Sequence, residues 1–134
     1  MIRYMLDTNT CIRLIKERPE GIHARLSGLD VEDVAISSIV AAELWYGVAL
    51  SEKKKQNESA LADFLDFVMV LDWPAGACPI YGRIRAHLKR KGTPIGARDF
   101  LIASHAAFLK AVLVTENTRE FDRVPDLKVE NWLA

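Results

Sequence analysis

Hydrophobic positions along the chain alternate between short continuous runs and longer stretches with helical spacing. The short runs predict buried strands at 2–6, 34–37, 68–71 and 111–115, with a final edge strand at 127–129. Apolar residues three and four positions apart predict helices at 9–16, 19–26, 38–50, 52–67, 79–91 and 98–110. Strands that alternate with helices in this way are typical of a parallel sheet covered by helices on both faces.

Local signals set the expected ends of several helices. Thr8 is expected to cap the first helix, Pro19 to open the second, and Gly92 with Pro94 to end the helix at 79–91. No repeat, low-complexity tract or flexible linker divides the 134 residues. We therefore expect one domain, spanning 1–134.

The composition indicates an ordinary globular protein, with 50% hydrophobic and 27% charged residues. No apolar run approaches the ~20 residues that a membrane span needs, and the N-terminus does not resemble a signal peptide. Cys11 and Cys78 lie in no CxxC pair, so they are expected to be reduced thiols. These features predict a cytoplasmic protein with no membrane contact.

The 18 basic and 18 acidic residues balance, which argues against simple non-specific coating of nucleic acid. Residues 73–98 nevertheless contain no acid. Their basic residues are Arg83, Arg85, Lys89, Arg90, Lys91 and Arg98, together with His87. Such a stretch is suited to contacts with phosphate, and its alternative interpretation is a solvated helix face.

Acids follow strands or lie on apolar helix faces at three places. Asp7 comes directly after the first predicted strand, where it either caps a helix or faces a ligand. Glu43 lies among Ile39, Val40 and Tyr46 at helical spacing. An ionised carboxylate there needs a partner, either a cation or an arginine in an internal salt bridge.

Asp99 repeats this pattern near the start of the most apolar predicted helix. The segment TENTREFDR then follows the strand at 111–115 and offers four further oxygen-bearing side chains, Glu116, Asn117, Glu120 and Asp122. Carboxyl ends of parallel strands meet at one edge of a sheet, so these groups are expected to converge.

Converging carboxylates raise one another's pKa values unless a cation neutralises them. Oxygen ligands of this kind suit Mg²⁺ or Mn²⁺, and no HxH, HExxH or CxxC spacing suggests zinc. The scattered histidines His23, His87 and His105 are expected to be structural or on the surface. No obvious covalent nucleophile is present, so the pattern favours phosphodiester hydrolysis by metal-activated water.

Four motifs in order carry a resemblance to a known family: LDTN, ISSIVAAELWYG, GTPIGARDFLIASHA and VLVTENTREFDRV, followed by ENW near the end. They resemble the PIN-domain ribonuclease toxins of bacterial toxin–antitoxin pairs, the VapC type, over nearly the whole chain. The resemblance implies an α/β fold of the PIN-like type, a three-layer α/β/α sandwich with a small, mainly parallel sheet. It also implies cleavage of RNA with Mg²⁺ or Mn²⁺.

The resemblance assigns the family's first three metal-binding, catalytic acids to Asp7, Glu43 and Asp99, with Thr8 supporting the first. Asn117 stands where the family often has a fourth aspartate. Glu120, one helical turn on, is expected to replace that acid in preference to its neighbours Glu116 and Asp122. Asn117 would then have a supporting role.

The expected partners also follow from the resemblance. They are RNA, a cognate antitoxin whose tail covers the acidic groove, and a second copy in a homodimer. Some members of the most similar subgroup cut initiator tRNA. The residues expected to contact RNA phosphates are Arg83, Arg85, Lys89, Arg90 and Lys91.

Two other classes of protein remain as alternatives. A phosphoacceptor signalling domain also gathers acids at strand ends, but it usually needs an acid pair after the first strand and a lysine after a late one. A catalytically inactive nuclease-like scaffold could serve only to bind an antitoxin or operator DNA. Asn117 is the feature that favours the scaffold.

Overall fold

The computed structural model describes residues 1–18 and 20–133, and these contain a single parallel sheet of five strands. The strands are β1 (Tyr4–Leu6), β2 (Val34–Ser37), β3 (Met69–Leu71), β4 (Val112–Val114) and β5 (Val129–Glu130). Their order is β3-β2-β1-β4-β5, with every neighbouring pair parallel. The mainly parallel sheet predicted from the apolar runs is confirmed.

The central strand β1 marks the point where the chain changes direction across the sheet. From β1 the chain builds outward through β2 and β3, then returns to the other side of β1 as β4. Met5 and Leu6 are fully buried at this centre. Ligands of open α/β sheets bind beyond the carboxyl ends of the strands at such a switch point, which here lies between β1 and β4.

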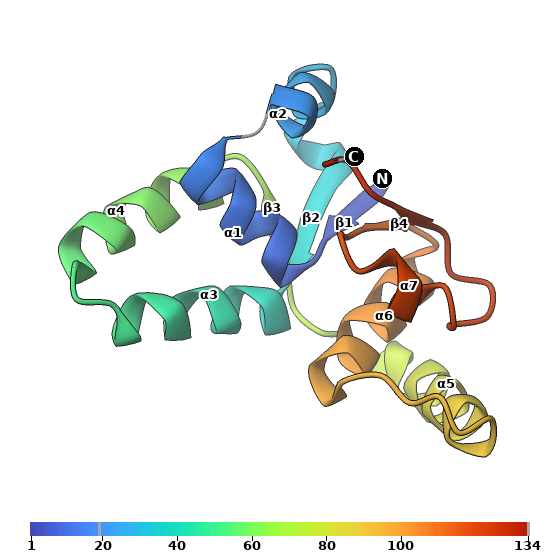
Figure 1. The fold of residues 1–134 in the computed structure, drawn as a ribbon. Helices are drawn as coiled ribbons and strands as arrows, with labels where there is room; N and C mark the ends of the chain where they lie inside the picture. Colours follow the sequence, from blue (N-terminus) through green and yellow to red (C-terminus); the bar gives the residue numbers. More distant parts are fainter. Residues whose placement is uncertain (19, 134) are drawn as a thin grey trace.

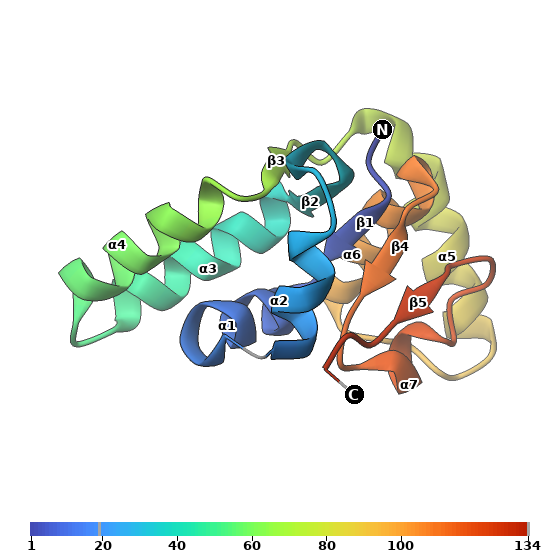
Figure 2. The same ribbon diagram turned by 90° about the horizontal axis from the view of Figure 1, so that it is seen from above.

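Helices cover both faces of the sheet. They are α1 (Thr8–Glu17), α2 (Glu20–Ser27), α3 (Ser38–Leu50), α4 (Lys54–Leu65), α5 (Cys78–Arg90), α6 (Ala97–Leu109) and α7 (Thr118–Phe121). α1, α3 and α4 gather on one side of the sheet, and α5 and α6 lie on the other (Figures 1 and 2). This arrangement is the predicted three-layer α/β/α sandwich. None of the described helices is long and apolar enough to span a membrane.

α5 and α6 pack against each other in opposite directions. The short 3₁₀ turn Ala75–Ala77, which leads into α5, packs against α6. A Cβ atom added to Gly76 would lie 2.5 Å from the ring of Phe108, near the end of α6, so the glycine lets this turn approach α6 without displacing that ring. The end of α5 therefore lies beside the beginning of α6, where Asp99 is located.

Several predicted element ends are wrong by a few residues. The cap of α1 is Asp7, whose Oδ1 accepts a hydrogen bond from the Thr10 N–H at 2.9 Å, and Thr8 is the first helical residue. α4 is shorter than the predicted helix at 52–67, and β5 begins two residues later than the strand predicted at 127–129. The expected helix start at Pro19 lies outside the described residues.

Candidate active site

The Asp7 carboxylate is fixed at the end of β1. The strand register pairs Leu6 with Val114, so Asp7 and Thr115 leave the sheet side by side. The Thr115 hydroxyl donates a hydrogen bond to Asp7 Oδ2 at 2.5 Å, and the Asp7 N–H donates to the Val114 carbonyl at 3.0 Å. Asp7 is 5% exposed, which requires such partners for a buried carboxylate. Asp7 is thus a helix cap and a wall of the candidate site at once.

Asp99 lies in the first turn of α6 and is half-buried. Its Oδ2 is close to Gly96, where an added Cβ would come within 3.1 Å. Burial raises the pKa of the Asp99 carboxyl, the negative charges of Glu120 and Asp7 raise it further, and Arg98 partly opposes them. The Asp99 carboxyl therefore feels the charges of acids from two other segments at this edge of the sheet.

Glu120 reaches this edge from α7, the short helix after β4. The Thr115 hydroxyl accepts a hydrogen bond at 2.9 Å from the N–H of Asn117, the residue that precedes α7. Asn117 thereby supports the site through its backbone, since its side chain forms no cap of α7. The same threonine oxygen joins Asp7 to the segment that carries Glu120.

Glu43 is engaged by a positive charge. Arg98 Nη1 donates a hydrogen bond to Glu43 Oε2 at 2.5 Å, which forms an ion pair between α6 and α3. This contact raises the pKa of the Arg98 guanidinium. The structure thus contains the arginine salt bridge that the sequence left open as one alternative for Glu43. Arg98 engages Oε2 of Glu43, so an ion would bind Glu43 through Oε1 or in exchange for Arg98.

The remaining acids of the 116–122 segment are directed elsewhere. Glu116 forms an ion pair with Arg13 of α1 at 2.9 Å, and Asp122 is exposed. In the described part of the chain, the Thr8 side chain forms no hydrogen bond with Asp7. The predicted hydroxyl support for Asp7 comes from Thr115 instead.

The donor set fits a hard divalent cation. As the side chains stand, no three His, Cys, Asp or Glu residues within 1–18 and 20–133 surround a point closely enough to cage an ion. Mg²⁺ is usually bound by only one or two carboxylates together with water and substrate phosphates, so a full protein cage is not needed. Burial raises the pKa of Asp99 most, and the negative charges of Glu120 and Asp7 add to it; a bound cation would relieve that part of the shift.

The predicted RNA-contact residues separate onto different faces of α5. Arg83 and Arg90 line a groove beside α6, whereas the Arg85 guanidinium lies over the rings of Tyr81 and Phe100. Lys89 and Lys91 are exposed outside that groove. The basic stretch therefore does not form one surface.

We assign no role in the candidate site to the histidines and cysteines. His105 is 1% exposed on α6, and its Nδ1 has no hydrogen-bond partner among the described residues. The His23 side chain lies outside the described part of the structure, and His87 lines the groove on α5. Cys11 and Cys78 are both free thiols, the first buried and the second exposed, as predicted.

Three residues that shape this site were not assigned to it from the sequence: Thr115, Gly96 and Arg98. The position of Thr115 directly after a buried strand was the available signal for the first. Gly96 is three residues before Asp99, which is the spacing between an N-cap and the third residue of a helix. The close approach of the Asp99 carboxylate to Gly96 depends on side-chain geometry, which this spacing does not give. The sequence grouped Arg98 with the basic residues of 73–98 and gave no sign of its contact with Glu43.

The PIN domain family matches residues 4–127. The chain therefore belongs to the PIN-domain family. Within that family it is similar over its whole length to proteins of the VapC type. Ribonuclease VapC2 of Rickettsia felis is 48% identical over 130 residues, which cover 96% of this chain and 97% of the relative. The tRNA(fMet)-specific endonuclease VapC of Salmonella typhimurium is 44% identical over 132 residues, covering 98% and 99% of the two chains.

Similar solved structures include VapBC complexes. VapBC2 from Rickettsia felis, bound to a DNA fragment from its promoter, contains a chain with a TM-score of 0.93 and 47% identity, covering 98% of this chain and 99% of that one. VapBC-1 from nontypeable Haemophilus influenzae gives a TM-score of 0.91 at 41% identity, with 100% of both chains covered. These matches confirm the predicted PIN-like α/β/α fold.

The fold also separates this chain from phosphoacceptor signalling domains. Those domains have the flavodoxin-like strand order 2-1-3-4-5, in which the first strand has the second and third as neighbours. Here β1 lies between β2 and β4. The strand order therefore excludes a phosphoacceptor signalling domain.

Proposed function

We propose that this chain is an endoribonuclease toxin of a VapBC-type toxin–antitoxin pair, cutting RNA in the cytoplasm with Mg²⁺ or Mn²⁺ as cofactor and water as nucleophile. The observation that carries the proposal is the position of Asp7 at the switch point between β1 and β4, with Asp99 close enough to feel the charges of Asp7 and Glu120. The names of the relatives support an RNA substrate. An uncharged pocket would have favoured the inactive scaffold instead.

Each acid has a distinct role in this proposal. Asp7 and Asp99 hold the cation most directly, and Glu120 supplies a further oxygen; each Asp7 oxygen accepts one hydrogen bond, which orients it and leaves a lone pair for the cation. When bound, the cation would neutralise phosphate oxygens and lower the pKa of a water molecule. Glu43 completes the site after exchanging its contact with Arg98, or orients the attacking water. Thr115 acts through Asp7 and is a positioning residue.

The substrate proposed is initiator tRNA, because the relative from Salmonella typhimurium is named as specific for tRNA(fMet) at 44% identity. The decisive assay compares cleavage of initiator tRNA with cleavage of an elongator tRNA by the purified protein. Cleavage of the initiator alone, lost in Asp7→Asn and in Asp99→Asn, is the expected result. Cleavage of neither RNA, by protein that binds Mn²⁺, would favour the inactive scaffold.

A cognate antitoxin is the proposed protein partner, supported by the VapBC complexes among the similar structures. A cavity of about 160 Å³ between α1, α3 and α4 has an apolar lining that includes Ile12, Val48 and Leu61, with Glu43 at its border. A segment with apolar side chains and a terminal cation would fill this cavity and approach the acids.

A homodimer is also proposed, because apolar side chains remain exposed on α3 and on the edge strand β3. Trp45 is 42% exposed and Tyr46 is 58% exposed, so neither belongs to the core. Met69 and Val70 on β3 are 38% and 44% exposed. Exposed aromatic and aliphatic groups of this kind mark protein interfaces. Light scattering of wild type and of the Trp45→Glu, Tyr46→Glu variant tests this proposal, with conversion to monomer expected.

A further inference from the structure

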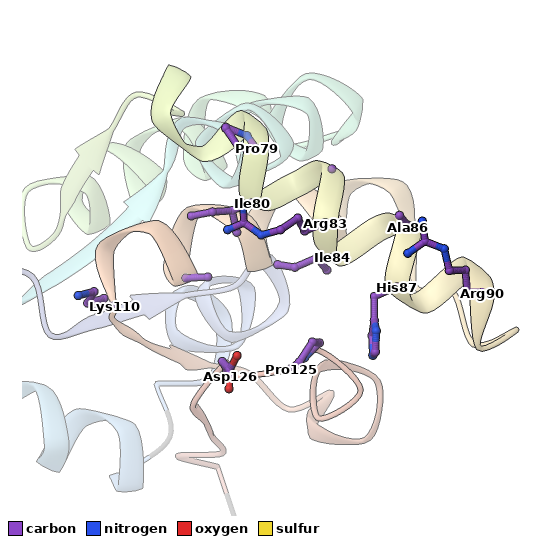
Figure 3. Close-up of a pocket in the computed structure, with 12 residues that line it drawn as sticks. Pro79, Ile80, Arg83, Ile84, Ala86, His87, Arg90, Lys110, Pro125 and Asp126 are labelled. Carbon is purple, nitrogen blue, oxygen red and sulfur yellow. The ribbon is translucent and has the colours of Figure 1, made fainter.

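A second concave surface lies on the outer side of the molecule, away from the α1–α3–α4 cavity. It is a groove of about 920 Å³ between α5, the end of α6 and the loop that follows α7 (Figure 3). Its apolar lining includes Ile80, Ile84, Ala107 and Pro125. We call it the α5 groove. None of the acids of the candidate site lines this groove, so they do not explain its function.

The α5 groove is bordered by cations along its length. Arg83, His87 and Arg90 are at positions i, i+4 and i+7 of α5, and so lie on one face of that helix. Lys110, directly after α6, stands at the opposite end of the groove from Arg90 (Figure 3). Asp126 is the single acid among the residues described as lining it.

These cations are not neutralised within the described part of the protein. Arg13, Arg25 and Arg98 each form an ion pair with a glutamate. By contrast, in residues 1–18 and 20–133 the side chains of Arg83, Arg90 and Lys110 form no ion pair. Three unpaired positive charges along one groove make a binding surface for a chain of negative charges.

The α5 groove is connected to the candidate active site along the chain. Because α5 and α6 are antiparallel, its Arg90 end is followed by the short turn 91–96 and then by Asp99. That turn is joined to the segment after α7, since Arg123 Nη1 donates a hydrogen bond to the Pro94 carbonyl at 3.2 Å. Both segments that border the groove at this end therefore continue to acids of the site.

We propose that the α5 groove binds the phosphate backbone of the RNA substrate beyond the point of cleavage, with Arg83, Arg90 and Lys110 contacting successive phosphates. The inference rests on the proposed ribonuclease function and adds an RNA-binding surface outside the acidic site. The apolar lining would pack against riboses and bases, a combination with cationic borders that single-stranded nucleic acid sites use. An acidic peptide shares the charge, but RNA is the occupant that the proposed ribonuclease function supplies.

The test compares two triple variants with equal loss of charge. The groove variant carries Arg83→Gln, Arg90→Gln and Lys110→Gln. The control carries Lys53→Gln, Lys54→Gln and Lys55→Gln, which change exposed lysines at the start of α4. Binding of unfractionated tRNA is measured in EDTA from low to high salt, with the RNA checked on gels for integrity and each protein checked by circular dichroism. RNA cleavage by wild type in Mn²⁺ is measured in parallel.

We expect the groove variant to bind tRNA at least about tenfold more weakly than the control at low salt. Its plot of log affinity against log salt should be less steep by about 2, since each lost single-strand phosphate contact removes ~0.7. Equal affinity and slope for the two folded variants would overturn the inference. Absence of cleavage by wild type, with groove-dependent binding intact, would refute the proposed function while supporting the groove.

Discussion

The Thr115 hydroxyl donates a hydrogen bond to Asp7 Oδ2 at 2.5 Å, across the ends of the two neighbouring strands β4 and β1. The other carboxylate oxygen, Oδ1, accepts from the Thr10 N–H at 2.9 Å. Both oxygens of Asp7 are therefore oriented by the protein itself. The Thr115 oxygen also accepts from the N–H of Asn117, so one hydroxyl holds together two walls of the site.

Replacing Thr115 by valine should impair RNA cleavage more than it impairs folding. Valine keeps the shape but leaves Asp7 Oδ2 and the Asn117 N–H without their partner. Loss of a residue that orients a metal ligand typically lowers activity or metal affinity ~10–100-fold, and an unsatisfied buried group costs ~1–3 kcal/mol of unfolding free energy. Initial cleavage rates and urea unfolding measure the two effects. Thr115→Ser retains the hydroxyl and should restore activity; equal rates for the valine and serine variants would contradict this role.

Replacing Gly96 by alanine should weaken cation binding, with only a modest loss of stability because alanine is a poorer N-cap than glycine. The new Cβ would lie 3.1 Å from Asp99 Oδ2, so the carboxylate must move by a few tenths of an ångström. The backbone tolerates alanine there, since Gly96 has a φ of −60°. We expect Mn²⁺ affinity to fall by about tenfold, as for other changes around metal ligands. Gly47→Ala is the matched control, because an added Cβ there meets nothing within 4 Å. Identical Mn²⁺ titrations for the two variants would disprove the steric argument.

Replacing Asp99 by asparagine should raise the thermal stability of the cation-free protein. Burial, Glu120 and Asp7 raise the pKa of the Asp99 carboxyl, so the folded state binds its proton more tightly than the unfolded state. Stability from this group is present below the unfolded pKa of about 4 and is lost as pH rises through the folded value. At pH 7 the ionised Asp99 is therefore unfavourable, and asparagine removes that repulsion.

Scanning calorimetry in EDTA at pH 7 measures this effect, with Asp122→Asn at an exposed position as control. Addition of Mn²⁺ should then raise the Tm of wild type but have little effect on Asp99→Asn. A lower Tm for Asp99→Asn than for wild type in EDTA would contradict the mutual repulsion of the three acids.

The sequence predicted the parts of this site that depend on local patterns, and it missed contacts between residues far apart along the chain. Asp7 and Asp99 were predictable because a strand end and an apolar helix are local patterns. The partner of Glu43 was left open, because Arg98 follows it by 55 residues and only the packing of α6 on α3 brings them together. Thr115 was missed because a threonine after VLV looks like an ordinary strand residue until the register with β1 is known.

The same limit applied to the basic stretch and to the element ends. Sequence order grouped Arg83 with Arg85, whereas the helix directs one to the α5 groove and the other over Tyr81 and Phe100. Thr8 was predicted as the N-cap of the first helix in place of Asp7, because threonine and aspartate both favour the N-cap position. The short helix α7 has only four residues, too few to show a helical period.

Removing the imidazole of His105 should reduce the loss of stability at mildly acidic pH. Burial lowers the pKa of His105, so below about 6.5 the unfolded state takes up a proton that the folded state resists. Unfolding free energy therefore falls as pH drops, by up to ~1.4 kcal/mol per pH unit from one such group. Urea unfolding between pH 7.5 and 5.5 should show a smaller decline for His105→Gln than for wild type. His87→Gln should retain the decline of wild type; a full decline in His105→Gln would contradict the burial effect.

The location of a bound cation tests the central claim most directly. Crystals of the wild-type protein soaked in Mn²⁺ should give an anomalous difference peak about 2 Å from carboxylate oxygens of Asp7 and Asp99, on the side of the site that Glu120 borders. Crystals of Asp99→Asn treated in the same way should lack that peak. A peak held by Glu116 or Asp122, or no peak at this edge of the sheet in wild type, would contradict the assignment of the site.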